Sequence, residues 1–364
     1  MIRDVRISLF SITIVLICIG MIMIYSASNI YAWERYHDGF FFLKRHASFV
    51  AIGSLLMLLV MGFDYRKFRK YSKPLLIVAL FLLVLVLVPG LGREVAGARR
   101  WFRFKFLSFQ PSELANLAVI IYVADFIARK GNTVTTFWKG FLPPMMVLGL
   151  VSLLILVQPD LGTTVSLGVV VMTMLFVAGV RGTYLLTLLL TSIPALYILI
   201  FSVPYRRARI LAFLNPYADP KGSGFQIIQS QIALGSGGIF GVGIGQSKQK
   251  LFYLPAAHTD FIFAIIGEEL GLIGTLGIII LFIIFIRQAL KIIKNSPDKF
   301  GYFLSLGLVT MICFKAVINI GVSCGILPTK GLPLPFISYG GSSFIFDMVS
   351  LGILMNIART GEYP

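Results

Sequence analysis

The residues best suited to chemistry lie between positions 251 and 270, where a polar segment ends and a long apolar segment begins. Asp260 stands at this junction. A carboxylate at the mouth of a membrane helix is close to water but walled by hydrocarbon, and this environment can give it an unusual pKa. Asp260 is therefore a candidate general base. An acid at this position can also cap the helix and complement its dipole, so both interpretations stay open here.

Basic residues concentrate in two polar segments, 93–105 and 204–250. Arginine and lysine form strong charge-assisted hydrogen bonds with phosphate, so these segments are candidates to bind a phosphate or diphosphate group. Scattered contacts with lipid head groups are the alternative explanation. The arginines expected to contribute are Arg99, Arg100, Arg206 and Arg209.

Membrane helices must position these residues, because the 364-residue chain is 57% hydrophobic and only 13% charged. Such a composition indicates one polytopic membrane domain over residues 1–364. The net charge of +17 would suit nucleic acid in a soluble protein, but a chain this apolar meets anionic lipid instead, and we expect no nucleic-acid partner. The three histidines and three cysteines lack the spacing of a metal site, so none is expected.

Ten apolar segments have the length of a membrane span, which predicts an all-α fold of about ten transmembrane helices. Basic residues are almost equally divided between the two sides, but those on one side lie in short turns that flank the spans and govern insertion. We therefore expect both termini in the cytoplasm and one long outer loop, about 203–258, between the seventh and eighth helices. The predicted spans are 8–27, 47–63, 74–90, 111–128, 141–157, 161–179, 184–202, 259–286, 301–327 and 344–358.

Two further segments have unusual composition. The glycine-rich stretch 235–245 fits no nucleotide-binding motif, so its glycines are expected to allow close backbone packing or contact with an anion. The piece 224–234 just before it is amphipathic. Residues 327–343 are too rich in proline and glycine to be helical through their centre, and they are expected to form a wall of the site or a plain re-entrant connector.

Several ionisable residues fall within the predicted spans, where each needs a partner or a wet cavity. Lys315 should be neutralised by an acid at similar depth, which favours Glu268, Glu269 or Asp125 over Asp347. Glu268 lies eight residues, or about 12 Å, beyond Asp260, so it is expected to anchor helix packing. The acids assigned supporting roles are Glu113, Asp160 and Glu268.

Five short motifs join the segments around Asp260 and 327–343, namely Gln110–Glu113, Gln158–Gly162, Pro204–Arg209, Asn215-Pro216 and Gly222–Gln226. Through these residues the chain strongly resembles the SEDS family of polytopic membrane glycosyltransferases, over essentially its whole length. Gln249-Lys250 and Lys330 favour the cell-division type of this family over the elongation type.

This resemblance implies polymerisation of lipid II, the undecaprenyl-diphosphate disaccharide-pentapeptide, at the outer face of the cytoplasmic (inner) membrane. Asp260 would be the catalytic general base of an inverting glycosyl transfer. The implied partners are a class B penicillin-binding protein, which is a transpeptidase, and other divisome membrane proteins. No cofactor is implied with certainty, and a divalent cation (Mg²⁺ or Mn²⁺) at the diphosphate is left open. The further residues taken as substrate ligands are Lys250, His258, Lys330 and Ser338.

Three positions depart from the family's usual pattern. Asn116 stands where a lysine usually follows Glu113 by three residues, so Glu113 needs another partner. Ala256 replaces a common glutamate near the site. Lys315 stands where an uncharged polar residue is usual.

Two other functions remain open at the level of sequence. Ten spans with buried charges and a basic outer cavity also suit a lipid II flippase or another transporter, although no inverted repeat is evident. A non-catalytic scaffold that activates the transpeptidase is the second alternative, and the intact His258-Thr259-Asp260 motif argues against it.

Overall fold

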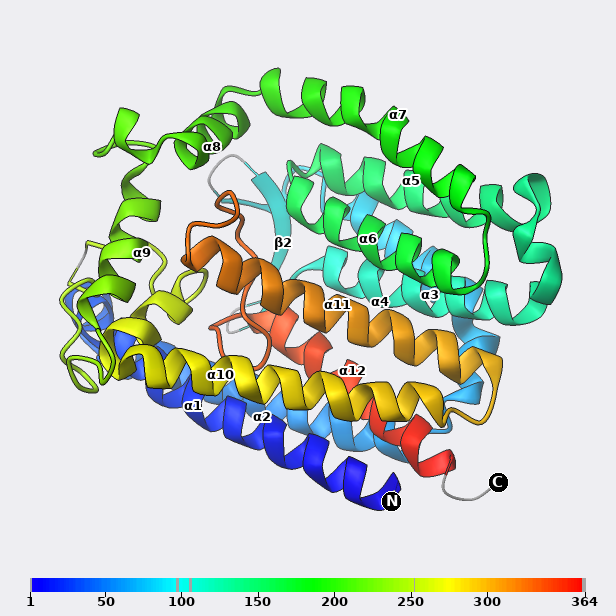
Figure 1. The fold of residues 1–364 in the computed structure, drawn as a ribbon, viewed down its shortest axis with the longest axis horizontal. Helices are drawn as coiled ribbons and strands as arrows, with labels where there is room; N and C mark the ends of the chain where they lie inside the picture. The colour runs from blue at the N-terminus through cyan, green and yellow to red at the C-terminus, as the bar shows by residue number, and fades with distance from the viewer. Residues whose placement is uncertain (1, 96–97, 105–106, 252, 362–364) are drawn as a thin grey trace.

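The computed structural model describes residues 2–95, 98–104, 107–251 and 253–361, which form a bundle of long helices with most of the short elements at one end (Figure 1). The long helices are α1 (Ile2–Tyr36), α2 (Phe41–Gly62), α3 (Arg66–Leu85), α4 (Pro111–Lys130), α5 (Leu142–Val157), α6 (Leu161–Val177), α7 (Gly182–Phe201), α10 (Ile262–Lys294), α11 (Lys299–Ser323) and α12 (Gly341–Thr360). The short elements are β1 (Arg93–Val95), β2 (Ala98–Phe104), β3 (Leu107–Phe109), η1 (Gly131–Thr135), η2 (Phe137–Phe141), α8 (Pro204–Leu214), η3 (Pro216–Ala218) and α9 (Phe225–Ser236).

Each of the ten predicted spans corresponds to one long helix, so the predicted polytopic all-α fold is confirmed. Eight helices of the described chain are long and apolar enough to cross a membrane. The exceptions are α3, whose first turns are basic, and α6, which has only 17 residues. The chain is thus a multi-pass membrane protein. Helix α1 begins and α12 ends at the end of the bundle opposite α9 (Figure 1), as an even number of spans requires.

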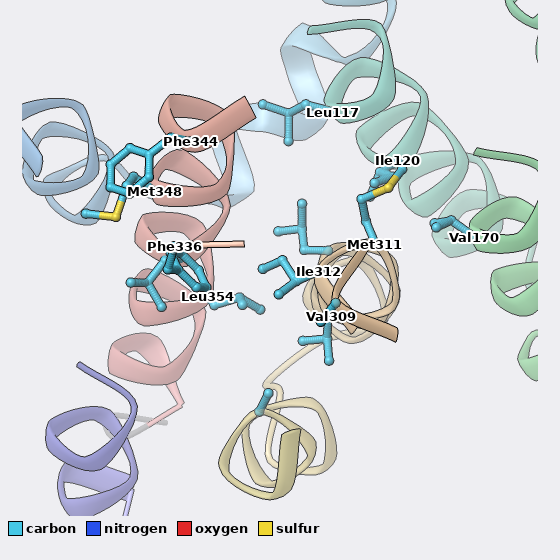
Figure 2. Packing of buried hydrophobic residues seen from close by; sticks show 14 of the residues in the cluster. Leu117, Ile120, Val170, Val309, Met311, Ile312, Phe336, Phe344, Met348 and Leu354 are labelled. Atoms are coloured by element: carbon cyan, nitrogen blue, oxygen red, sulfur yellow. The ribbon is translucent and has the colours of Figure 1, made fainter. Parts of the chain in front are cut away.

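Tightly packed apolar side chains hold the bundle together. Helix α2 packs on α12, α3 on α4, α1 on α10, and α11 lies against both α4 and α10. Figure 2 shows Ile120 of α4 beside Met311 and Ile312 of α11, and all three are buried. Helix α7 packs less closely than the others. Leu185 is its only buried residue among those described, and the helix lies at the edge of the bundle (Figure 1).

A small antiparallel sheet connects α3 to α4 and was not predicted from the sequence. Its strand order is β1-β2-β3, and Glu94 pairs across the strands with Arg99 through a 3.2 Å ion pair. The sheet is fastened to α12, because the Ser342 hydroxyl donates to the Ser108 carbonyl oxygen at 2.8 Å. Much of the basic segment 93–105 is therefore ordered by strand pairing, while Lys105 lies outside the described residues.

The glycine-rich stretch packs its backbone against α10 where that helix breaks at Gly271 (φ 67°). The Val242 amide donates to the Glu268 carbonyl oxygen at 2.9 Å, and the Leu272 amide donates to the Gly238 carbonyl oxygen at 2.9 Å. A Cβ on Gly241 would lie 2.1 Å from the Glu269 carbonyl oxygen. These contacts confirm the predicted close backbone packing. The amphipathic piece predicted just before the stretch is helix α9.

Candidate active site

A tight turn places Asp260 immediately before α10. The Ala256 carbonyl oxygen accepts hydrogen bonds from the amides of Thr259 and Asp260, both at 3.1 Å. The N-cap of α10 is Phe261, which makes no side-chain cap hydrogen bond. Among the described residues, the Asp260 carboxylate has no hydrogen bond or ion pair. The geometry therefore does not support the capping interpretation, and it leaves this carboxylate available for chemistry.

The irregular segment 324–340 lies directly against this turn. The Asn319 side-chain amide donates to the backbone carbonyl oxygens of Asp260, at 3.0 Å, and Leu332, at 2.8 Å. The Ser338 hydroxyl donates to the Thr259 carbonyl oxygen at 2.7 Å. A Cβ on Gly331 would lie only 3.0 Å from an Asp260 carboxylate oxygen. This segment thus forms the predicted wall beside Asp260 rather than a plain connector.

His258 lies in an aromatic cluster next to this wall. Its ring centroid is 4.5 Å from that of Phe42 and 5.7 Å from that of Tyr339. Burial lowers the pKa of His258 to about 4, so the ring is neutral near pH 7. His258 therefore shapes the wall but supplies no positive charge for a phosphate.

The electrostatic environment of Asp260 suits a general base. Burial raises the pKa of Asp260 to about 6, and the positive charge of Arg209 opposes this rise. The Arg209 guanidinium comes from α8, stacks 4.4 Å from the Tyr205 ring centroid and donates to the Thr329 carbonyl oxygen at 3.2 Å. A carboxyl group with this pKa is largely ionised near pH 7 and is a stronger base than an ordinary aspartate.

A second cation, Lys330, lies in the same wall. Burial lowers the pKa of Lys330 to about 8, and the charge of Asp160 opposes the change. The lysine stem crosses Gly162, where a Cβ would lie 2.7 Å from Lys330 Cε. Asp160 itself caps α6, because its side chain accepts hydrogen bonds from the Thr163 amide, at 3.1 Å, and hydroxyl, at 2.9 Å. Capping of α6 is thus the structural contact that Asp160 makes, in keeping with a supporting role.

The other three arginines have their own anchors. Arg100 donates to the carbonyl oxygens of Gln158, at 2.8 Å, and Pro159, at 2.6 Å, which ties the sheet to the residues just before α6. Arg99 is paired with Glu94 in the sheet. Arg206 donates to the Leu199 carbonyl oxygen at 2.9 Å. Among the described contacts, only that of Arg209 reaches the wall beside Asp260.

Lys250 has a buried partner of its own. Its ammonium lies 3.0 Å from a Glu269 carboxylate oxygen, with side chains only 6% and 0% exposed. Ser26 of α1 also donates to Glu269. The neighbouring Glu268 accepts a hydrogen bond from the Lys248 amide at 2.9 Å, so it anchors the loop before Asp260 to α10. These contacts give Lys250 a structural role and offer no support for substrate binding by it.

Lys315 is neutralised as predicted, but by other acids. Its ammonium lies 2.9 Å from Glu113 and 3.1 Å from Asp347, and all three side chains are buried. The preference for Glu268, Glu269 or Asp125 over Asp347 was therefore wrong. Depth alone does not determine the partner, because Lys315 faces α4 and α12. Glu113 thus has the alternative partner that Asn116, one helical turn away, made necessary.

The acids that depth favoured are engaged elsewhere. Asp125 of α4 pairs with Arg69 at 3.1 Å and with Arg129 at 3.0 Å. Glu268 and Glu269 hold the loop before α10, as described above. A comparison of depths could not predict the partners of these acids, because depth does not tell which face of its helix a residue occupies.

Asn319 is a site residue that the sequence analysis missed. It follows Lys315 by four residues, so both lie on one face of α11. A second polar residue on the buried face of an apolar helix was the available signal. In the described part of the chain, no group of three or more His, Cys, Asp or Glu residues is arranged to hold a metal ion.

The fold and this site define a polytopic membrane protein that presents a desolvated carboxylate at one end of its helix bundle, with Arg209 acting on its charge and Lys330 in the adjoining wall. A model of the cell cycle protein family that comprises FtsW, RodA and SpoVE matches residues 6–363. The chain belongs to this family.

Relatives of this chain are similar to it over nearly their full length. A probable peptidoglycan glycosyltransferase FtsW from Geobacter metallireducens is 47% identical over 95% of this chain and 92% of that protein. Stage V sporulation protein E from Bacillus subtilis is 45% identical over 97% and 96%.

Solved structures are similar as well. One, described as coordinating polymerization and crosslinking in a peptidoglycan synthase complex, is 31% identical with a TM-score of 0.80 over 98% of both chains. The rod shape determining protein RodA of Thermus thermophilus is 28% identical with a TM-score of 0.73, over 98% of this chain and 97% of that one.

Proposed function

We propose that this peptidoglycan glycosyltransferase polymerises lipid II at the outer face of the cytoplasmic membrane, with Asp260 as the general base. The observation that carries the assignment of the base is the desolvated carboxylate of Asp260 at the mouth of α10, which no described residue pairs with. The names of relatives that are 47% identical over almost the whole chain support the activity.

The chemistry follows from the positions of the charges. Asp260 accepts the proton of the acceptor sugar 4-hydroxyl, whose oxygen forms a bond to the anomeric carbon of the donor. The bond between that carbon and the lipid diphosphate breaks at the same centre, so the configuration inverts. Arg209 and Lys330 stabilise the negative charge that develops on the departing diphosphate. The chain's own cations supply this charge, so no step is assigned to a metal ion.

The orientation follows from this assignment. Lipid-linked sugars are joined outside the cell in this proposal, so the end of the bundle with Asp260 faces outward. Both termini then lie in the cytoplasm, because α1 begins and α12 ends at the opposite end (Figure 1). The short basic turns at that end agree with the positive-inside rule.

A class B penicillin-binding protein is the proposed partner. The solved assembly to which this chain is similar is described as coordinating polymerization with crosslinking, and crosslinking is a transpeptidase reaction. Other divisome membrane proteins are proposed as further partners from the resemblance to the cell-division type.

Purified full-length protein, supplied with lipid II in detergent, should form glycan strands that a gel resolves by length. Detergent removes the membrane barrier, so a flippase would leave lipid II unchanged in this assay. The same reaction is repeated with the cognate transpeptidase added. A non-catalytic scaffold would give no glycan in either reaction. Absence of glycan under both conditions would contradict the proposed activity.

Replacing Arg209 by glutamine is expected to weaken lipid II binding about 10-fold or more, because a charge-assisted contact to the diphosphate is lost. Arg207→Gln is the matched control, since Arg207 is an exposed arginine on the same helix. Binding of labelled lipid II to detergent-purified protein measures both. Equal affinities for the two variants would favour the head-group explanation for these arginines. Arg99, Arg100 and Arg206 are tested in the same way.

A further inference from the structure

A strongly basic pocket of about 440 Å³ lies between α3 and α4. Five of the seven side chains that line it are cationic, and one is acidic. We call it the basic pocket, and its residues are Arg66, Arg69, Lys70, Ser72, Lys73, Asp125 and Arg129.

The basic pocket lies at the end of the bundle opposite Asp260. Arg66 pairs at 3.3 Å with Asp298, which stands in the turn between α10 and α11. Helix α10 begins beside Asp260 and has 33 residues, which corresponds to about 50 Å at 1.5 Å per residue. The basic pocket is therefore separate from the site of glycosyl transfer.

One buried carboxylate organises the basic pocket. Asp125 is 3% exposed and holds Arg69 at 3.1 Å, Arg129 at 3.0 Å and the Ser72 hydroxyl at 2.9 Å. Two guanidinium groups are thereby fixed side by side, each with further N–H groups to donate. A preorganised pair of this kind suits the oxygens of a phosphate group.

In the described part of the chain, no acid balances the remaining charge of the basic pocket. Lys70 and Lys73 are exposed and have no ion pair with any residue in the described ranges. Asp125 already forms ion pairs with Arg69 and Arg129, and Asp298, which pairs with Arg66, does not line the pocket. Cations held this close repel one another unless an anion lies among them.

The adjoining surface of α3 is suited to an acyl chain. Ile77, Phe81 and Val84 follow Lys73 at helical spacing, so they continue its stripe along the helix. They are 65%, 62% and 50% exposed, respectively. A lipid whose phosphate occupies the basic pocket would lay its acyl chain on this stripe. A soluble phosphate would make no use of it.

We propose that the basic pocket binds the phosphodiester head group of an anionic phospholipid, in the membrane leaflet opposite the Asp260 site. Arg69 and Arg129 contact the phosphate oxygens, and Lys70 and Lys73 add the charge that selects an anionic lipid over a zwitterionic one. The lipid then bridges α3 and α4 at the ends where those helices carry their densest positive charge.

Native mass spectrometry of full-length protein in detergent, titrated with phosphatidylglycerol or phosphatidylcholine, tests this proposal. Phosphatidylglycerol is expected to bind about 10-fold or more tightly than phosphatidylcholine. The double variant Lys70→Gln/Lys73→Gln should weaken phosphatidylglycerol binding about 10- to 30-fold, because each lysine near an anionic lipid contributes to affinity. It leaves both arginine pairs of Asp125 in place.

Lys291→Gln/Lys294→Gln is the matched control, because it removes two exposed lysines from the last turn of α10 at the same end of the bundle. It should leave lipid affinity almost unchanged. Equal loss in both double variants, or equal binding of the two lipids to the parent protein, would overturn the proposal. So would displacement of phosphatidylglycerol by millimolar inorganic phosphate or by an acidic peptide, which would assign the pocket to a soluble anion or to a protein partner.

Discussion

Asp260→Asn is expected to slow glycan synthesis about 10²–10⁴-fold, the usual contribution of a general base. Asparagine keeps the shape of aspartate but cannot accept the proton of the acceptor hydroxyl. The initial rate of lipid II polymerisation measures the effect. Glu34→Gln is the control, because Glu34 is an exposed acid in the last turns of α1 at the same end of the bundle and has no hydrogen bond or ion pair among the described residues.

The same variant should be folded normally. The pKa of Asp260 is raised to about 6 by burial, so protonation favours the folded state. The stability that this proton contributes is present below the ordinary aspartate pKa and is lost as pH rises through about 6. Near pH 7, Asp260→Asn should therefore leave thermal stability unchanged or slightly raise it. Loss of activity with an unchanged melting temperature separates the catalytic role from a structural one.

The pH dependence of the parental rate gives a second readout of this prediction. The rate should fall as pH drops through about 6, because Asp260 becomes protonated and can no longer act as a base. It should also fall above about 8, where Lys330 loses the charge that holds the diphosphate. A flat profile around pH 6, or near-parental synthesis by Asp260→Asn, would show that another group takes the proton.

The sequence predicted those features that depend on local pattern. Ten apolar runs became ten long helices, because each buries its backbone polar groups within itself in a membrane. The prolines and glycines of 327–343 kept that segment irregular, and the glycines of 235–245 allowed backbones to touch. These outcomes require no knowledge of which helices are neighbours.

Features that depend on neighbouring helices were not predicted. Lys315 pairs with Glu113 and Asp347 because α11 lies beside α4 and α12. The depth of a residue along its helix does not tell which helices are neighbours. The partner of Lys250 was also not predicted, because Glu269 is 19 residues away in the chain and is brought near only by the fold. The sheet at 93–109 was missed because its strands are short and carry several charges.

The buried cluster of Lys315, Glu113 and Asp347 yields the second large effect. Lys315→Met should destabilise the protein by about 3–5 kcal/mol, because it leaves two buried carboxylates without a cation. Lys291→Met is the control, since Lys291 is exposed on α10. Thermal unfolding in detergent compares the two. Similar melting temperatures for both variants would mean that the cluster stabilises little.

Exchange of the lysine between helices tests whether charge or position matters in this cluster. Asn116 and Glu113 lie three residues apart on α4, and the Asn116 side-chain oxygen is buried without a partner among the described residues. The double variant Asn116→Lys/Lys315→Asn moves the ammonium to α4, three residues from Glu113 on the same helix face. It should be more stable than Lys315→Asn alone. Asn116→Lys by itself adds a second buried cation beside Lys315 and should be destabilising.

A coupling energy of roughly 1–3 kcal/mol between the two positions is expected, since both share Glu113. Additive effects of the two substitutions would show that Lys315 serves Asp347 and not Glu113.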